Sequence, residues 1–557
     1  MAESTSPTID RSAVWVGLAV LLVFGPLVGA GYVWDDDALI VQNTALSGWK
    51  AFFSAWTGGL WDHTPQAQHP PIYYRPVMLW SLQVDHLLGG SARLAHLHSL
   101  GWHLLNVGLV AVVARRLGCS STAAWTSAGL FGLHPVAVES VAWISARNDP
   151  MSVAAILGML AVSLRPGSKP RLVHLAAMAA FGAAAKETAY LAPVCLAPVL
   201  WAARRPIGRP VLGALIGVSA VLIGRWLAGV AWPPGADAAH LLASAWPTSA
   251  WAMDALAMPS VRAPGGHLAW PEPIPMVGVL AGLAGGLVLL WAGRRKALGL
   301  SVLGVIGVLP AWPAVAHVGL FGDRYLLLSL AGFALAVATS LDRATRARRL
   351  RPELWLLLAL PHAVTASASV TAWQDDTTLW TAAVERHENP HTAGSLAKVL
   401  ELQGDLDGAA HWYSVATMAP RPLPHACWNV AAIELKRGAP ADAGEVGLRA
   451  LAAGCPSDPE LICPTAYGLA AKGLWTAAEE VLAKLTTRGT GLCTITKLAG
   501  SARRREVSAL DAAVAGESPG WTSLAERLGL LLRSGGDLET AEWVDALARE
   551  RQREEGG

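Results

Sequence analysis

Three consecutive carboxylates, Asp35, Asp36 and Asp37, follow the first long apolar stretch of the sequence. Residues 13–33 carry no charge and are numerous enough to cross a bilayer core as a helix. The carboxylates therefore stand where this helix must leave the lipid. A carboxylate in such a place can take the proton from an attacking hydroxyl group, or it can be a solvated loop residue. The rest of the chain decides between these interpretations.

Further charged side chains stand beside or inside later apolar stretches. The cations Arg75, Arg147 and Lys186 are suited to a phosphate, because a guanidinium group binds phosphate through paired hydrogen bonds. Ionisable groups inside apolar segments are costly, so they usually line a polar cavity or pair with each other. Together with the carboxylates, these residues predict group transfer from a lipid phosphate to an acceptor. The second-rank candidates are Asp37, His134, Glu139, Asp149, Glu187 and Arg324.

Each candidate also has a structural interpretation. Arg75 can pair with Asp62 or Asp85, the adjacent Lys186–Glu187 can form an ion pair that affects only packing, and His134 can cap a helix.

We expect no metal site at His96, His98 and His103, since these residues lie in a predicted span without a nearby cysteine. A divalent ion bound between residues 35–37 and a phosphate is chemically possible.

Apolar runs alternate with short polar loops from Ala13 to Thr371 and predict about eleven membrane spans. The first lacks a convincing cleavage site and is expected to be retained. The expected spans are roughly 13–33, 94–114, 122–138, 150–165, 171–185, 187–202, 210–230, 275–293, 298–317, 324–340 and 353–372.

Lys and Arg gather in alternate loops, which the positive-inside rule places in the cytoplasm. Residues 35–37, the loop 231–272 and the C-terminal domain are then expected outside, with a cytoplasmic N-terminus. The basic loops contain Arg115 and Arg116; Arg165, Lys169 and Arg171; Arg204, Arg205 and Arg209; residues 294–296; and residues 343–351.

The C-terminal part contains an internal repeat. GDLDGAA begins at Gly404, GAPADAG at Gly438, GLWTAAE at Gly473 and GDLETAE at Gly536, with an alanine five residues after each glycine. Glycine suits the turn between two helices because it adopts positive φ without strain. The spacing resembles tetratricopeptide repeats, which often bind proteins on a concave face; a structural cap on the membrane domain is the alternative. Residues 489–519 match poorly and are expected to be a degenerate repeat.

The four cysteines of this part can form one or two disulfides in an oxidising compartment, or remain buried thiols. They are Cys427, Cys455, Cys463 and Cys493.

The order of motifs resembles the transmembrane and tetratricopeptide repeat-containing O-mannosyltransferases and their bacterial relatives, within the type C glycosyltransferase superfamily. The motifs are VWDDDALIVQN, YYRPV, HLLN, LHPVAVESVAWISARND, AKETAYLAP and FGDRYLLLSLAGF. Val110 and Asp323 stand where members of the family often have His and Glu.

The resemblance implies a polyprenyl-phosphate sugar donor, an inverting transfer and catalysis by the acidic pair after the first span. Asp36 is then the expected general base and Asp35 positions the acceptor or assists. The expected donor-phosphate ligands are Arg75, Arg147 and Lys186.

We therefore expect an all-α protein with a polytopic membrane domain at 1–372, including a long outer loop at 34–93, and a repeat domain at 373–557. The expected enzyme of the bacterial inner membrane moves sugar from the lipid donor to a protein Ser or Thr hydroxyl on the periplasmic face, with the repeats recruiting the acceptor. The alternatives are a non-catalytic membrane-anchored scaffold for envelope assembly and a transferase for envelope polysaccharide or lipid. The net charge of +2 argues against a nucleic-acid partner.

Overall fold

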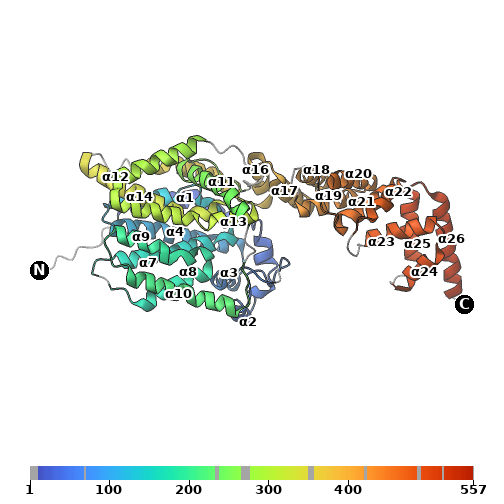
Figure 1. The fold of residues 1–557 in the computed structure, drawn as a ribbon, viewed down its shortest axis with the longest axis horizontal. Coiled ribbons are helices and arrows are strands. Elements are labelled where there is room, and N and C mark those ends of the chain that lie inside the picture. The colour runs from blue at the N-terminus through green and yellow to red at the C-terminus, as the bar shows by residue number, and fades with distance from the viewer. Residues whose placement is uncertain are drawn as a thin grey trace. The chain divides into compact units, whose positions relative to one another are not determined.

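The computed structural model describes residues 10–67, 70–167, 169–232, 237–264, 276–348, 357–418, 423–485, 491–516 and 520–555. The regular elements of these segments are helices, which confirms the predicted all-helical class (Figure 1). The chain divides into two compact units, residues 1–382 and 383–557. The expected boundary at 372/373 lies shortly before this division. The expected loop at 231–272 is only partly within the described residues.

Unit 1 contains long apolar helices around a closely packed interior. Its main helices are α1 (Arg11–Phe24), α3 (Pro76–Leu87), α4 (Ala92–Arg116), α5 (Ser121–Gly132), α6 (Ala137–Ala142), α7 (Asn148–Leu164), α8 (Leu172–Ala185), α9 (Ala192–Ala202), α10 (Gly208–Leu227), α11 (Ala238–Ala257), α12 (Met276–Val308), α13 (Ala311–Val318), α14 (Leu327–Arg348) and α15 (Leu360–Thr371).

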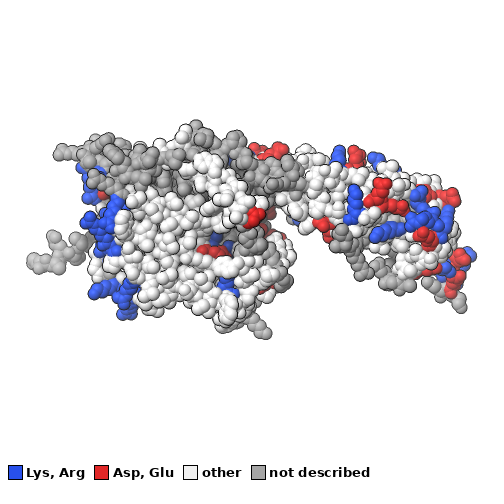
Figure 2. All heavy atoms as spheres, viewed as in Figure 1, with Lys and Arg blue, Asp and Glu red and all other residues white. Residues whose placement is uncertain are grey.

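Five helical segments of the described chain are long and apolar enough to cross a membrane, which supports a membrane protein. Large apolar side chains on α1 and α10 are exposed, including Trp15 (68%) and Trp226 (78%), as expected for lipid-facing surfaces. Lys and Arg side chains gather at one end of unit 1, with a largely uncharged surface beside them (Figure 2). The five segments are Arg11–Gly29, Ala92–Arg116, Gly208–Leu227, Arg295–Ala316 and Asp323–Arg343.

Two predicted boundaries in unit 1 are wrong. Residues 294–296 do not form a loop, because α12 continues as a helix from Met276 to Val308. The segment GRRKALGL contains no proline and is rich in good helix formers. The expected span 122–138 is instead broken between α5 and α6, at His134 and Pro135. Proline disfavours a helical conformation in the residue before it.

The segment 34–93, which was expected to be an outer loop, is folded against the helices of unit 1. It contains α2 (Trp49–Ser54) and α3, with short helical turns at Asp37–Val41 and Thr44–Leu46. Tyr74, Met78 and Leu82 are almost fully buried in an apolar cluster that also includes residues of α8 and α10. This packing fixes the residues that precede α3 beside the ends of other helices.

Unit 2 consists of successive helix pairs, and its turns confirm the predicted role of the repeated glycines. Gly404, Gly438, Gly473 and Gly536 all have positive φ, between 75° and 85°. The alanines five residues later are almost completely buried. The paired helices are α17 (Pro390–Gln403) and α18 (Leu406–Thr417), α19 (Pro424–Lys436) and α20 (Pro440–Ala452), α21 (Pro459–Ala471) and α22 (Trp475–Leu482), α23 (Gly491–Arg503) and α24 (Val507–Gly516), and α25 (Gly520–Ser534) and α26 (Leu538–Glu555).

The poorly matching segment 489–519 also contains a helix pair, α23 and α24. Its turn contains Arg505 at φ 58° instead of a glycine. The sequence match is therefore lost at this turn although the helical architecture continues.

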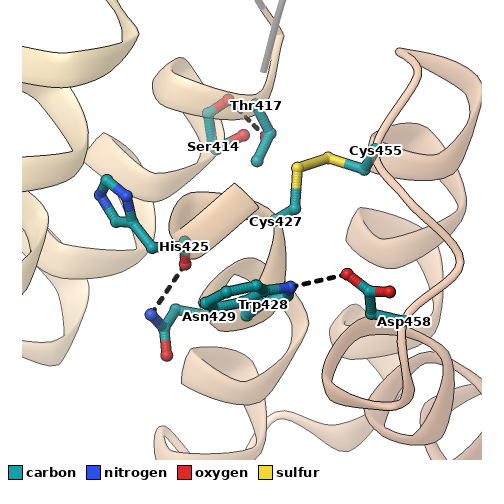
Figure 3. The surroundings of a disulfide bond; sticks show 8 residues. All are labelled: Ser414, Thr417, His425, Cys427, Trp428, Asn429, Cys455 and Asp458. Atoms are coloured by element: carbon teal, nitrogen blue, oxygen red, sulfur yellow. Dashed lines mark hydrogen bonds between the residues drawn. A yellow bond between two sulfur atoms is a disulfide. The ribbon is translucent and has the colours of Figure 1, made fainter. Parts of the chain in front are cut away.

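Two disulfides join neighbouring helices of unit 2. Cys427 of α19 pairs with Cys455, which follows α20, and Cys463 of α21 pairs with Cys493 of α23. The Cα–Cα distances are 5.7 and 4.6 Å, within the usual range. Figure 3 shows the first bridge, beside which the Trp428 indole N–H donates to Asp458 at 3.0 Å.

Candidate active site

Asp36 is buried and connects the acidic loop to the segment between α6 and α7. One carboxylate oxygen accepts hydrogen bonds from the Ser145 backbone N–H (2.8 Å) and hydroxyl (2.5 Å). The other accepts the Val33 N–H at 3.3 Å. Burial raises the pKa of Asp36 to about 7, although the hydrogen bonds from Ser145 oppose this rise. With 0% of its surface exposed, Asp36 presents no atom to a substrate in this conformation.

Asp35 lies in a more open environment than its neighbour. It is partly exposed, and among the described residues no hydrogen-bond donor is bonded to its carboxylate. Burial raises the pKa of Asp35 to about 6, the Arg324 charge lowers it, and Asp376 raises it. A carboxylate with this pKa is mostly ionised at neutral pH and able to accept a proton. Asp37 is exposed and accepts a hydrogen bond from the Gln42 side chain.

Three cations near the acidic loop each pair with a carboxylate from a distant part of the sequence. Arg75, just before α3, donates two hydrogen bonds to Glu187 at 2.7 and 2.9 Å. Lys186, at the end of α8, lies 2.5 Å from Asp149 of α7. The third pair joins Arg324, before α14, to Glu139 of α6.

Aromatic rings and charge interactions bring these three cations together. Arg324 lies 4.5 Å and Lys186 lies 5.3 Å from the centre of the Tyr325 ring. The charges of Arg75 and Arg324 also act on Lys186. Arg75 stacks on Tyr73 at 4.8 Å. The structure thus assembles Arg75, Lys186 and Arg324 into one group, which we call the cation cluster.

The cation cluster is sheltered without being closed off. The side chains of Arg75, Lys186 and Arg324 keep 15%, 7% and 13% of their surface exposed. A phosphate that reached them would meet three positive charges in surroundings of low polarity, where electrostatic attraction is strong.

Arg147 lies outside this cluster, contrary to its expected role as a ligand of the donor phosphate. It is completely buried, and its guanidinium group is bonded to Asp85 at 2.5 Å, Ser81 at 2.8 Å, Ser99 at 3.0 Å and the Ala95 carbonyl at 2.7 Å. These partners belong to α3 and α4. Arg147 therefore holds those helices together and has no donor turned toward a ligand.

The three ion pairs considered as structural alternatives do not form. Arg75 pairs with Glu187 and not with Asp62 or Asp85, because the turn before α3 lies against the start of the segment after α8. Lys186 and Glu187 do not pair with each other, since each bonds to another partner.

Trp34 connects the acidic loop to the aromatic groups around Arg324. Its ring stacks on Trp143 at 4.4 Å, and Arg324 lies 4.8 Å from the Trp143 ring. Its backbone N–H donates to Asp376 of α16 (Asp376–Arg386) at 2.7 Å, and its ring meets Trp380 edge-on at 5.1 Å. Trp34 has φ 57°, an uncommon conformation for a bulky residue.

The candidate histidines bond within the protein. The His134 ring accepts the Val136 N–H at 3.2 Å, just before α6, and stacks on His362 at 4.5 Å. His96 and His103 bond to backbone carbonyl groups, and His98 bonds to Asp85. In the described part of the chain, no three His, Cys, Asp or Glu residues are grouped as metal ligands.

Sequence reasoning missed four residues of the site: Ser145, Trp143, Tyr325 and Asp376. The sequence feature that could have identified them is their position inside the segments WISARND, FGDRYLL and WQDD. Ser145 is 109 residues from Asp36, and nothing in the local pattern indicates that they are bonded.

These features describe an all-helical membrane protein with a sheltered group of cations near a partly exposed carboxylate. Over 141 residues, 24% of this chain and 14% of the relative, the sequence is 31% identical to Protein O-mannosyl-transferase Tmtc2 of Drosophila melanogaster. Over 154 residues it is 24% identical to Protein O-mannosyl-transferase TMTC4 of Homo sapiens, covering 24% of this chain and 20% of the relative. The matches thus span a fifth or less of these relatives. No family model and no solved structure matches the chain. Over about a quarter of its length, the chain is thus similar to proteins named protein O-mannosyl-transferases.

Proposed function

We propose that this protein transfers a sugar from a polyprenyl-phosphate donor to a Ser or Thr hydroxyl group of a protein. The observation that carries the proposal is the placement of Asp35, a partly exposed carboxylate with a pKa near 6, beside Arg324 of the cation cluster. The cluster supplies positive charge for a lipid phosphate, and Asp35 supplies a base for the acceptor.

In the proposed reaction, the acceptor oxygen attacks the anomeric carbon of the sugar as the bond from that carbon to the phosphate oxygen breaks. The electron pair of the broken bond leaves with the lipid phosphate, whose added charge the cation cluster stabilises. The acceptor proton passes to Asp35. Attack opposite the leaving phosphate inverts the anomeric configuration.

We assign the base to Asp35 rather than to Asp36. Asp36 is enclosed and occupied by Ser145 and Val33, so it acts as a positioning residue for the acidic loop. Arg75, Lys186 and Arg324 are the proposed phosphate ligands, with Arg147 removed from that group. Glu139, Asp149 and Glu187 hold these cations in place. Since each of these three carboxylates already faces a cation, none of them is free to bind a divalent metal.

The expected outer, non-cytosolic location is part of the proposal. Two disulfides within unit 2 support it, because such bridges persist in oxidising compartments. The concentration of Lys and Arg at one end of unit 1 agrees with a cytoplasmic face there (Figure 2).

We further propose that unit 2 recruits the acceptor protein. Several large apolar side chains of its helices remain exposed, including Leu402 (75%), Leu530 (63%) and Trp428 (40%). Helix-pair arrays commonly bind other chains through such surfaces.

The experiment compares Asp35→Asn, Asp36→Asn and Asp37→Asn in purified full-length protein. The donors are radiolabelled polyprenyl-phosphate sugars, and the acceptor is an envelope-protein extract. A general base typically contributes about 10²–10⁴-fold to the rate. Asp35→Asn should therefore lower transfer at least about hundredfold with unchanged donor binding, while Asp37→Asn serves as the exposed control.

A wild-type rate for Asp35→Asn would refute the base assignment. Label appearing in lipid or polysaccharide, and not in protein, would favour another envelope acceptor. The scaffold alternative has its own support, since every member of the cation cluster is paired in the structure. It predicts no transfer with any donor of the panel.

A further inference from the structure

An apolar cavity lies beside the basic end of α4. It has a volume of about 670 Å³ and is formed by α4 and α5 with Asp10 at the start of α1. Leu105 and Val112 line it while remaining 47% and 38% exposed, so the cavity opens to the surroundings of the helices. Its other lining residues include Leu104, Leu109 and Trp125.

The lining residues follow one face of α4 from Leu104 to Arg116. At 1.5 Å per residue this is about 18 Å. Half of a bilayer core is about 15 Å thick. The cavity is thus long enough to accommodate the acyl chain of one leaflet and ends at Arg115 and Arg116.

Three arginines near this end have no acidic partner in the described part of the chain: Arg115 and Arg116, which line the cavity, and Arg165, which follows α7. The nearby Asp342 pairs instead with Arg346. The charges of Arg116 and Arg165 act on each other. Arg115 donates to the Cys119 carbonyl at 2.8 Å. The acid in the lining, Asp10, is held by the Ser12 N–H and the Ser121 hydroxyl. These arginines therefore differ from the cation cluster, in which every cation is paired.

This cavity is separate from the candidate active site. The acidic loop lies near the first part of α4, because Asp36 bonds to Ser145 and Arg147, two residues further on, bonds to Ser99 of α4. Arg116 lies 17 residues further along the helix, which corresponds to about 26 Å. A ligand with its charged group at Arg116 therefore lies in the opposite leaflet from a donor at the cation cluster.

We propose that this cavity binds an anionic phospholipid, with an acyl chain along α4 and the headgroup phosphate at Arg116 and Arg165. Basic pockets between membrane helices on the cytoplasmic side bind anionic headgroups in this way. The apolar length of the cavity favours a lipid over a free phosphate. The proposal does not require the sugar-transfer reaction.

The test measures phosphatidylglycerol bound to full-length protein in phosphatidylcholine nanodiscs. The first variant is Arg116→Ala with Arg165→Ala, with Arg93→Ala at the other end of α4 as its control. The second is Gly108→Phe, which fills the cavity and leaves both arginines in place. Its matched control is Gly101→Phe, since both glycines have open space around an added Cβ atom and Gly108 alone of the two lines the cavity.

The arginine variant and Gly108→Phe should each weaken phosphatidylglycerol binding at least tenfold, while both controls bind as wild type. If the arginine variant lost phosphatidylglycerol binding and Gly108→Phe did not, the proposal would be overturned, because the charges would then bind lipid without the cavity. The proposal would also be overturned if phosphatidylcholine bound as tightly as phosphatidylglycerol. The same holds if polyprenyl phosphate displaced bound phosphatidylglycerol at a lower concentration than phosphatidylglycerol itself does.

Discussion

Neighbouring carboxylates acquire different properties from their surroundings in this protein. Asp35 is partly open and Asp36 is enclosed, although the two are adjacent in the sequence. With a pKa near 6, Asp35 becomes a competent base as the pH rises through that value. We therefore expect the rate of sugar transfer to increase with pH around 6 and then level off. A flat profile from pH 5 to 8 would contradict the role of Asp35.

Asp36 should make stability depend on pH in the opposite sense to an ordinary salt-bridged aspartate. Its pKa rises from 3.8 to about 7 on folding, so the folded state binds its proton more tightly. The stabilisation is complete below about pH 4 and is lost as the pH rises through about 7. We expect the Tm of wild-type protein to fall between pH 5 and 7.5, and Asp36→Asn to reduce this fall. Asp37→Asn is the exposed control, and equal slopes for all three proteins would refute the explanation.

Arg505 has a backbone conformation that is unfavourable for a residue other than glycine. It adopts φ 58° at the position where four other turns have glycine. A non-glycine residue in this conformation costs roughly 1 kcal/mol. Arg505→Gly should thus be more stable than Arg505→Ala by about 1 kcal/mol, since both lose the same side-chain contacts. Amide hydrogen exchange in α23 and α24 should then be about fivefold slower in the glycine variant, and equal exchange would show that the turn is unstrained.

At the scale of elements, the disulfides fix which helices stay together. Each closes a loop with a sequence separation of 28 or 30 residues. A bridge over such a loop stabilises a domain by about 3–4 kcal/mol. We expect Cys463→Ala with Cys493→Ala to lower the Tm of unit 2 clearly. Peptide mapping without reductant should find the pairs 427–455 and 463–493, and any other pairing would contradict the fold.

Local sequence patterns predicted where the helices lie better than they predicted which distant residues contact each other. Glycine and alanine spacing located the helix pairs of unit 2 because those residues are required by the turn and the close packing of each pair. The charged motifs contained the ionisable residues that pair in the structure, since ionisable groups in apolar segments need partners. The exclusion of Arg147 could not be predicted, because its partners Ser81 and Ser99 look like ordinary helix residues. The continuity of α12 was missed because a basic triplet was interpreted as a loop.

At the scale of the whole molecule, orientation in the membrane is directly testable. The two cysteines outside the disulfides, Cys119 and Cys195, are buried, so unmodified protein should give little background labelling. We expect an impermeant maleimide to label Asp37→Cys on intact spheroplasts, and Lys169→Cys only after permeabilisation. Both positions are exposed. The proposed outer site would be rejected if both variants were labelled without permeabilisation, or if Lys169→Cys were labelled on intact spheroplasts and Asp37→Cys only after permeabilisation.

Trp34, beside the acidic loop, contacts residues that lie far along the chain. Its N–H is held by Asp376 and its ring by Trp143 and Trp380, while the next residue is Asp35. A small shift of α16 must consequently move the peptide bond that carries the proposed base. Because α16 leads into unit 2, an acceptor protein bound there, as proposed, would shift the Asp35 carboxylate if its binding moved this helix.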